Sequence, residues 1–557
     1  FFKQKTYYDM AQFLVCSEMC IRDRYNCIQI ICVMRPRVAA FYMQYVRAVG
    51  LKKIFCGRMR RRRCNMKYIL ALDQGTTSTR AVLFSEDGRP VHSCGREIPQ
   101  IYPAPGMVEH DPEEIFFSSL RVISNVLSKA GATCADIAAM GITNQRETTI
   151  VWEKATGRPI CNAIVWQCRR TEKRCKQLAA DGYTEFIRRK TGLIPDPYFS
   201  ATKLEWILSN IPGARRRAER GELLFGTVDT YLIWKFTEGR VFATDYTNAA
   251  RTMLFNIHTL QWDEELLSLF CIPRAMLPEV RAGGADFGCT DAHWFGGEIA
   301  IRGVAGDQQA ALFGHLCLEK GQAKNTYGTG CFMLMNAGSE APAVKDGLLT
   351  TLCACVDGRP QYALEGSVFI GGAAVQWLRD GLGIITSAAE TEELARRVSD
   401  TAGMYFVPAF NGLGAPWWDG SACGILSGIT RGARREHIVR AVLEGIAFRV
   451  NDVLRAMEEA SDTTISGLAV DGGASANDFL MQFQADISAC TVIRPAVTEV
   501  TSLGAAYLAG LSCGYWKAEE LFGNKVVERR FNAEMHEKKR AQLLCGWQQA
   551  IRRSRMQ

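Results

Sequence analysis

Residues 68–84 read Tyr68-Ile-Leu-Ala-Leu-Asp-Gln-Gly-Thr-Thr-Ser-Thr-Arg-Ala-Val-Leu-Phe84, an apolar run, a polar turn and a second apolar run. The first run is continuous, as is typical of a strand that is buried on both faces of a sheet. After the second run, Glu86-Asp87-Gly88 is a turn signal of the kind that closes hairpins. The stretch therefore predicts a sheet that opens with a β-hairpin, whose first turn is rich in hydroxyl groups.

A helix and another strand follow this hairpin. Asp111 can cap the helix, Pro112 suits its first position and Gly131 can end it. The next strand, residues 137–142, ends in Thr143-Asn-Gln-Arg-Glu147. Strands and helices continue to alternate, which predicts α/β architecture.

The pattern starts afresh near residue 315. The elements predicted there are strands over 324–329 and 362–365, a long amphipathic helix over 437–457, a strand over 468–470, the turn Asp471-Gly-Gly473 and a helix beginning near Asn477. No repeat of about 20–50 residues occurs, which excludes a solenoid. We expect two large α/β lobes of comparable size, an N-terminal lobe over 66–314 and a C-terminal lobe over 315–557.

The composition is that of a globular protein. It is 48% hydrophobic, 22% charged and 10% aromatic over 557 residues, which excludes disorder, collagen and coiled coil as overall classes. The net charge of +8 resides in residues 1–65, whose 14 basic and 3 acidic residues give +11 and leave −3 for the rest. The main part of the chain thus gives no reason to expect a nucleic-acid partner.

The apolar residues of 1–65 show no sustained helical or strand periodicity. We therefore expect residues 1–65 to be a non-native or disordered leader, with the native start at Met66.

Cysteine spacing and hydropathy bear on the compartment. No apolar run of about eighteen residues occurs, so no membrane span is expected. Fifteen of the 21 cysteines lie after residue 65, and they follow neither a disulfide framework nor a metal-site spacing. No cleavable signal peptide precedes them, so we expect reduced thiols in a cytoplasmic protein.

Two acidic turns in the first lobe suggest phosphate chemistry. Asp73 follows one buried strand, and Asp307, in Gly303-Val-Ala-Gly-Asp307, follows a second apolar strand at 299–301. Glycines let backbone N–H groups approach phosphate closely, and threonine and serine hydroxyls add donors. One carboxylate near the phosphates can hold Mg²⁺ through water, and the other can accept a proton from an alcohol. Either turn alone is more often an ordinary turn, because Asp and Gly are common turn residues.

A third turn, Asp471-Gly-Gly-Ala-Ser-Ala-Asn477, joins a strand to a helix in the second lobe, and its glycines suit a flat ligand such as adenine or ribose. Gly328-Thr-Gly330 adds a further loop that allows close approach. No P-loop and no protein-kinase signature occurs in the chain. If the chain uses ATP, these loops supply a different cradle.

Several long motifs carry a family resemblance. They are Ala71-Leu-Asp-Gln-Gly-Thr-Thr-Ser78, Gly141-Ile-Thr-Asn-Gln-Arg-Glu-Thr-Thr149, Asn162-Ala-Ile-Val-Trp-Gln-Cys-Arg-Arg170, Gly306-Asp-Gln-Gln-Ala-Ala-Leu-Phe-Gly314, Asn325-Thr-Tyr-Gly-Thr-Gly-Cys-Phe-Met333 and Val470-Asp-Gly-Gly473. In this order, over residues 66 to about 555, they resemble the glycerol kinase group of the FGGY sugar-kinase family. The resemblance implies a two-lobed actin-like ATPase fold, related to ribonuclease H, with a cleft between the lobes.

The resemblance also implies roles for single residues. Thr76, Thr77, Ser78 and Arg80 would bind the phosphates of ATP, and the second lobe would bind the nucleotide through Thr329, Gly372, Gln376, Gly473 and Asn477. The acceptor would be bound by Arg146, Glu147, Tyr198, Asp307 and Gln308, with Trp166 and Phe332 as an apolar wall. Asp73 would be the water-mediated partner of Mg²⁺, and Asp307 would be the base.

The implied activity is ATP-dependent phosphorylation of glycerol to sn-glycerol 3-phosphate, by a cytoplasmic homodimer or homotetramer. Two alternatives stay open: a kinase for another small polyol or ketose, and a non-catalytic actin-like ATPase module.

Each of these residues also has an interpretation in which it serves the structure alone. Arg146 and Glu147 could be a surface ion pair, Asp307 a helix cap and Trp166 a core residue.

A regulatory segment is expected just before the Asp307 strand. Some bacterial members are inhibited by fructose 1,6-bisphosphate through a Gly-rich loop that ends in an arginine, but Glu298 stands at about that position here, which predicts little inhibition. Residues 292–298 resemble a stretch of Firmicutes-type members whose histidine is phosphorylated by the phosphocarrier protein HPr. His293 is accordingly the predicted regulatory residue.

Overall fold

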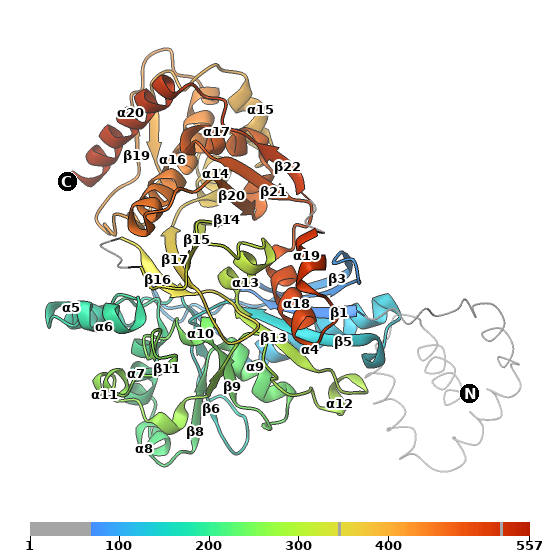
Figure 1. Ribbon diagram of the computed structural model, residues 1–557. Coiled ribbons are helices and arrows are strands. Elements are labelled where there is room, and N and C mark those ends of the chain that lie inside the picture. Colours follow the sequence, from blue (N-terminus) through green and yellow to red (C-terminus); the bar gives the residue numbers. More distant parts are fainter. Residues whose placement is uncertain (1–67, 343–346, 524–526, 557) are drawn as a thin grey trace, which may run out of the picture. The chain divides into compact units, whose positions relative to one another are not determined.

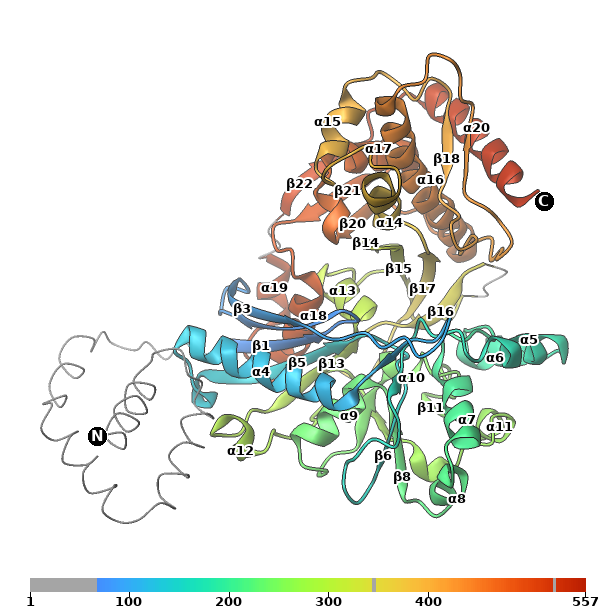
Figure 2. The same cartoon turned by 180° about the vertical axis from the view of Figure 1, so that it is seen from behind.

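The structure is a computed structural model that describes residues 68–342, 347–523 and 527–556. The predicted leader, residues 1–65, and the predicted start at Met66 lie outside the described residues. The described residues form two large sheets with helices packed on them, and several two-stranded pairs besides (Figures 1 and 2).

The first sheet has five strands in the order β13-β5-β1-β2-β3. Its strands are β1 (Tyr68–Gln74), β2 (Ser78–Phe84), β3 (Pro90–Glu97), β5 (Ile137–Asn144) and β13 (Ile301–Gly306). The predicted hairpin is confirmed, because β1 pairs antiparallel with β2. β1 and β13 both run parallel to β5, so the polar residues that follow β5 and β13 meet at one edge of the sheet.

Two boundaries differ from the sequence prediction. Asp73 belongs to β1 and Arg80 to β2, where they are paired opposite one another, so that only residues 75–77 form the turn. The second predicted strand, 299–301, is shifted, because Gly303 lies inside β13. A glycine is needed there, since a Cβ at Gly303 would stand 2.6 Å from the backbone nitrogen of Ala509.

Helices cover both faces of the first sheet. α4 (Pro112–Ala130) packs on β2 and β3, and it begins and ends as predicted: Asp111 accepts from the Glu113 N–H at 2.9 Å, and Gly131 has φ 61°. The opposite face is covered by α18 (Val500–Ser512), which packs on β1, β5 and β13 (Figure 1). Although α18 lies beyond residue 315, the chain returns there to the first sheet.

The second sheet has seven strands in the order β16-β17-β15-β14-β20-β21-β22. They are β14 (Ala323–Tyr327), β15 (Cys331–Gly338), β16 (Leu349–Leu352), β17 (Tyr362–Val368), β20 (Gly467–Asp471), β21 (Thr491–Pro495) and β22 (Val527–Phe531). β14 pairs antiparallel with β15 and parallel with β20, as β1 does with β2 and β5. Both sheets therefore share one local topology, a hairpin beside a parallel strand.

The predicted long helix of the second lobe is α16 (Arg435–Ser461), the centre of a large apolar core. The other helices after residue 315 are α14 (Gly372–Gln376), the π-helix η3 (Trp377–Gly381), α15 (Glu390–Arg396), the 3₁₀ helix η4 (Gly473–Ala476), α17 (Asp478–Ser488), α19 (Ala518–Gly523) and α20 (Glu537–Arg555). β18 (Tyr405–Val407) and β19 (Ile425–Ser427) form a separate pair.

The remaining elements of the first half lie outside its sheet. Its helices are α5 (Glu172–Ala180), α6 (Thr184–Thr191), α7 (Ser200–Asn210), α8 (Ala214–Glu219), α9 (Val228–Phe236), α10 (Tyr246–Ala249), α11 (Glu264–Leu269), α12 (Ala292–Phe295) and α13 (Asp307–Gly314), with 3₁₀ turns η1 (Cys134–Asp136) and η2 (Arg274–Met276). Short strands pair as β4 (Glu109–His110) with β7 (Ala163–Ile164), β6 (Ile150–Glu153) with β8 (Leu223–Gly226), β9 (Ala243–Asp245) with β12 (Glu279–Arg281), and β10 (Phe255–Asn256) with β11 (Gln261–Trp262).

Within residues 68–342, 347–523 and 527–556, all 15 cysteines are thiols rather than disulfides. None of the helices described in this part of the chain is both long and apolar enough to cross a membrane.

Candidate active site

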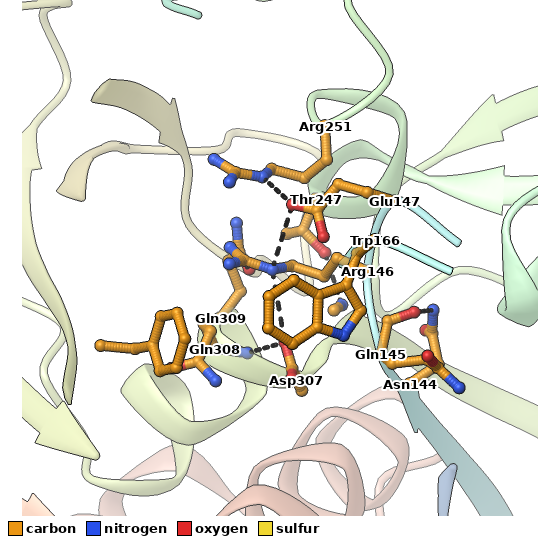
Figure 3. A network of polar contacts seen from close by, with 12 residues as sticks. Asn144, Gln145, Arg146, Glu147, Trp166, Thr247, Arg251, Asp307, Gln308 and Gln309 are labelled. Atoms are coloured by element: carbon orange, nitrogen blue, oxygen red, sulfur yellow. Dashed lines mark hydrogen bonds and ion pairs between the residues drawn. The ribbon is translucent and has the colours of Figure 1, made fainter. Parts of the chain in front are cut away.

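Four predicted residues come together at the edge of the first sheet where β5 and β13 end (Figure 3). Arg146 and Glu147 follow β5, while Asp307 and Gln308 open α13 directly after β13. Because the two strands are parallel neighbours, their carboxyl ends bring the four side chains to one place.

Arg146 is the centre of this cluster. Its Nε lies 3.3 Å from Asp307 Oδ1 and 3.7 Å from Glu147 Oε1, and its side chain is only 1% exposed. The Asp307 side chain is 31% exposed, so its carboxylate is accessible to solvent while the guanidinium of Arg146 is buried. Arg146 and Glu147 are therefore a buried group and not a surface ion pair. Asp307 is the first residue of α13, whose N-cap is Gly306.

Two charged residues that no motif singled out complete the group. Glu365, in β17 of the second sheet, contacts both Nη atoms of Arg146 at 2.6 and 3.1 Å. Arg251 donates from Nε to Glu147 at 2.5 Å and from Nη2 to Glu365 at 2.8 Å. Two arginines and two glutamates thus alternate in a site that excludes water.

The pKa values of the two glutamates move in opposite directions. Burial opposes the charged form of Glu365, but Arg146 and Arg251 more than offset it and lower its pKa to about 2. For Glu147, burial raises the pKa above its ordinary value, although the same two arginines favour the carboxylate. Glu147 also has a φ of 59°, in the left-handed region that a side chain other than glycine rarely adopts. Such a conformation persists only where the surroundings hold it.

An aromatic wall lies beside the charged group. The Tyr198 hydroxyl accepts from Arg146 Nη2 at 3.2 Å, and the Trp166 ring centroid lies 5.4 Å from that of Tyr198 and 6.3 Å from that of Phe332. Trp166 Nε1 donates to Thr76 Oγ1 at 2.9 Å. Its ring is half-buried. The wall therefore joins the residues predicted for the acceptor to the first turn of the sheet.

Lys324 of β14 supports Gln308. Its Nζ donates to Gln308 Oε1, and to Thr326 Oγ1 at 2.9 Å. Burial lowers the pKa of Lys324, although Asp471 and Asp307 both favour its charged form. A buried ammonium thus orients the amide that the sequence assigns to the acceptor.

Asp73, near the end of β1, lies close enough to Asp307 for their charges to interact. Burial and the charge of Asp307 raise the pKa of Asp73 to about 7, while Arg80 and a 3.4 Å hydrogen bond from Ser502 act in the opposite direction. The Arg80 side chain is 47% exposed and pairs with Glu499 at 3.1 Å.

A metal site made only of protein ligands is absent from the described residues, which contain no group of three or more His, Cys, Asp or Glu side chains able to hold an ion. Mg²⁺ does not need such a group, because it commonly uses one or two carboxylates and completes its shell with water and phosphate oxygens. Asp73 is the residue whose protonation behaviour such a cation would change.

A cavity of about 480 Å³ lies in the second lobe. Its lining includes the five residues predicted there for the nucleotide, namely Thr329, Gly372, Gln376, Gly473 and Asn477. Apolar side chains of Val375, Leu443 and Leu480 line the same cavity, which suits a flat heterocycle. Its volume falls in the range of small-molecule sites.

The loops around this cavity depend on glycine. Gly372 donates its N–H to the Gly328 carbonyl at 2.8 Å, and a Cβ on Gly372 would stand 2.7 Å from that oxygen. Asn477 caps α17 by accepting from the Leu480 N–H at 2.9 Å, so the predicted helix begins one residue later. Asp471 of the same turn is buried and shares a 2.7 Å hydrogen bond with His315, so it does not line the cavity.

The segment predicted to be regulatory lies at the surface. His293 is in the short helix α12, with its side chain 53% exposed, and its Nδ1 is 2.8 Å from Asp291 Oδ1. Its ring centroid lies 4.0 Å from that of Trp294. Glu298 is exposed.

Sequence reasoning missed Glu365, Arg251 and Lys324. A signal for two of them was present, because Glu365 and Lys324 are charged residues within predicted strands, and charged residues are rarely buried unless they are paired. Their partners lie far along the chain, so the pattern could mark the residues without giving the contacts.

Comparison with known proteins places these features in a family. The model of the N-terminal domain of the FGGY family of carbohydrate kinases matches residues 68–314, and that of its C-terminal domain matches residues 323–513. Glycerol kinase 2 of Thermotoga maritima is 59% identical over 490 residues, which cover 88% of this chain and 99% of that protein. The glycerol kinase of Caldanaerobacter subterraneus subsp. tengcongensis is 58% identical over 489 residues, covering 88% and 98%.

Solved structures give the same picture. The crystal structure of Plasmodium falciparum glycerol kinase with ADP superimposes with a TM-score of 0.84 at 36% identity, over 88% of this chain and 99% of that one. The ligand-bound xylulose kinase of Lactobacillus acidophilus has a TM-score of 0.78 at 23% identity, over 88% and 99%, and so shows the fold alone. The predicted two-lobed actin-like ATPase fold is thereby confirmed.

Proposed function

This chain belongs to the FGGY family of carbohydrate kinases, and from this premise we propose that it transfers the γ-phosphoryl group of ATP to glycerol, giving sn-glycerol 3-phosphate. The observation that carries the proposal is the cluster at the ends of β5 and β13. There Asp307 is part-exposed beside a compact set of polar groups and an aromatic wall. The relatives named glycerol kinase, at 58–59% identity over 88% of the chain, support the same acceptor.

The acceptor site suits a small triol. Glu147, Tyr198 and Gln308 present oxygens and an amide for hydroxyl groups, and Arg146 adds donors. Trp166 and Phe332 cover the C–H face of the carbon chain. Because the polar groups are held by one another and by Lys324, their positions are set before a substrate binds.

Asp307 is the proposed base. Its carboxylate accepts the proton of a primary hydroxyl as the hydroxyl oxygen attacks the γ-phosphorus in line. Arg146 holds the carboxylate in place through its Nε, 3.3 Å away. Closure of the lobes would exclude water, which would otherwise compete as the acceptor.

The nucleotide is proposed to lie between the second-lobe cavity and the first turn of the sheet. The base and ribose fit the cavity lined by Thr329, Gly372 and Gln376. Hydroxyls of Thr76, Thr77 and Ser78, together with Arg80, would donate to the phosphates and offset the charge that develops during transfer. Mg²⁺, held through water by Asp73, would neutralise phosphate oxygens when it is bound with ATP.

A coupled ADP-release assay with and without glycerol tests the proposal. Glycerol-dependent ADP release, with sn-glycerol 3-phosphate as product, is the expected result. Turnover on another polyol or ketose in a substrate panel, but not on glycerol, would favour the rival kinase. ATP consumption that ignores every added acceptor would favour an actin-like ATPase module.

Regulation at α12 is also proposed. The exposed His293 is accessible for phosphorylation by HPr, and added negative charge shortly before β13 would act on the strand that leads to Asp307. Incubation with HPr, enzyme I and phosphoenolpyruvate should place phosphate on His293 and change activity. An unmodified His293, or unchanged activity after modification, would contradict regulation by phosphorylation.

Glu298, in place of an arginine, further predicts little inhibition by fructose 1,6-bisphosphate, and strong inhibition would refute that prediction.

Assembly and compartment are proposed on the resemblance alone. We expect a homodimer or homotetramer in the cytoplasm. Analytical ultracentrifugation measures the first property, and fractionation of source cells the second.

A further inference from the structure

A buried charge group bridges the two sheets, and two of its four members have no role in the proposed chemistry. Arg146 and Glu147 follow β5 of the first sheet, whereas Glu365 lies within β17 of the second. Arg251 lies between them and contacts both glutamates (Figure 3 shows its contact to Glu147). Each of the four side chains is at most 2% exposed.

Glu365 fixes the orientation of Arg146. Its two oxygens accept hydrogen bonds from the two Nη atoms at 2.6 and 3.1 Å, and this bidentate geometry fixes the plane of the guanidinium. With both Nη atoms engaged there, the Nε of Arg146 is left to face Asp307 at 3.3 Å. The carboxylate of Glu365 therefore decides which edge of Arg146 faces the base.

Arg251 fixes the orientation of the Glu147 carboxylate. Its Nε donates to Glu147 Oε1 at 2.5 Å while its Nη2 is anchored on Glu365 at 2.8 Å. Its guanidinium carbon lies 5.3 Å from the ring centre of Tyr198 and 5.1 Å from that of Phe199, so packing holds its plane as well. This contact helps to retain Glu147 in its left-handed backbone conformation.

The strand that carries Glu365 also leads to the nucleotide loop. β17 ends at Val368, and four residues later Gly372 lines the cavity of the second lobe. That loop is fixed by the Gly371 N–H, which donates to the Thr329 carbonyl at 2.8 Å. One strand thus links the place proposed for the nucleotide with the orientation of Arg146.

We propose that Glu365 and Arg251 are positioning residues that preset the acceptor site, with Glu365 acting from the second lobe. The identity of the acceptor rests on the proposed function, but the positioning does not. Without the charge on Glu365, the nearest carboxylates to Arg146 are Asp307 and Glu147. The guanidinium is then drawn toward the base and away from the hydroxyl it should bind.

Glu365→Gln tests this, because it keeps the shape of the side chain and removes its charge. We expect kcat/KM for glycerol to fall about 100-fold, since displacement of a positioning group by about 1 Å has effects of this size. The KM for ATP should stay within about twofold, because no atom of Glu365 lines the nucleotide cavity. Glu365→Asp, which keeps the charge on a shorter stem, should recover part of the loss.

Asp452→Asn is the matched control. Asp452 is also a buried carboxylate of the second lobe, and it bonds with Arg449 at 2.9 Å and with Trp547 at 3.0 Å, neither of which is a proposed site residue. The control should lower the melting temperature without changing the KM for glycerol. Arg251→Lys provides a second test at the other positioning residue, with a selective loss in kcat/KM for glycerol expected there too.

The outcomes separate the two proposals. A folded Glu365→Gln enzyme whose kcat/KM for glycerol stays within about threefold of wild type would overturn the positioning role. So would equal losses in Glu365→Gln and the control. Should Glu365→Gln not fold, unchanged kinetics in Arg251→Lys would overturn it. A wild-type chain without activity on glycerol refutes the proposed function alone, and the variants are then compared on whichever acceptor of the panel it phosphorylates.

Discussion

Asp307→Asn removes the proposed base while keeping the volume of the side chain. Asp307 accepts from the Gln308 N–H at 2.7 Å, and an asparagine oxygen can accept the same bond. The side chain is part-exposed at the start of α13, so the loss of stability should be about 1 kcal/mol or less. The substitution therefore tests chemistry rather than folding.

The expected loss follows from the role. General base catalysis contributes about 10²- to 10⁴-fold, which corresponds to about 3–5 kcal/mol of transition-state stabilisation. Arg146 adds to the loss, because its Nε then keeps only Glu147, at 3.7 Å, as a nearby carboxylate. We expect kcat to fall by about three orders of magnitude at unchanged affinity for ATP.

The assay is the coupled ADP-release reaction at saturating ATP and glycerol, with nucleotide affinity measured by calorimetry. Asp286→Asn is the control, since Asp286 is a carboxylate of the same half that is 68% exposed and pairs with Arg302, away from the proposed site. It should behave as wild type. A kcat for Asp307→Asn within about tenfold of wild type would remove Asp307 from the base role.

Other substitutions should each change one separate quantity. Gly372→Ala sets a Cβ 2.7 Å from the Gly328 carbonyl oxygen, so the KM for ATP should rise about tenfold while that for glycerol does not; an equal rise in both would contradict this. Burial and a neighbouring carboxylate raise the pKa of Asp73 from 3.8 to about 7. Folding therefore favours the protonated carboxyl, and the stability that this group contributes is complete below the lower pKa and is lost as pH rises through the upper one. Asp73→Asn should therefore gain in melting temperature relative to wild type across that window, and it should need more Mg²⁺; a pH-independent difference would refute the assignment. Trp166→Ala removes half of the apolar wall and should raise the KM for glycerol about tenfold, as steady-state kinetics would show, leaving the KM for ATP as it is.

Local elements were predictable because their causes are local. The first hairpin, the cap at Asp111 and the αL glycine at Gly131 depend on residues a few positions apart, and the structure has all of them. The shift of the predicted strand at 299–301 has a tertiary cause. In the sequence, Gly303 resembles a turn residue. In the structure it lies within β13, where the absence of a Cβ allows α18 to pack closely.

The candidate site divides in the same way. Motifs in chain order identified Arg146, Asp307 and the cavity residues, because each lies in a short stretch whose residue types fit a polyol or a phosphate. They did not identify Arg251, which has no such stretch, or Glu365, whose strand was predicted without its partner.

The amino-acid order alone thus determined the α/β class and the first hairpin, and it predicted the residues that we propose for phosphate and acceptor. Tertiary structure alone decided that α18 covers the first sheet and that Glu365 meets Arg146 across 219 positions of chain. The physical reason is range. Hydrogen bonding and side-chain period act over a few residues, whereas a buried ion pair forms only where packing of two separate sheets removes both partners from water.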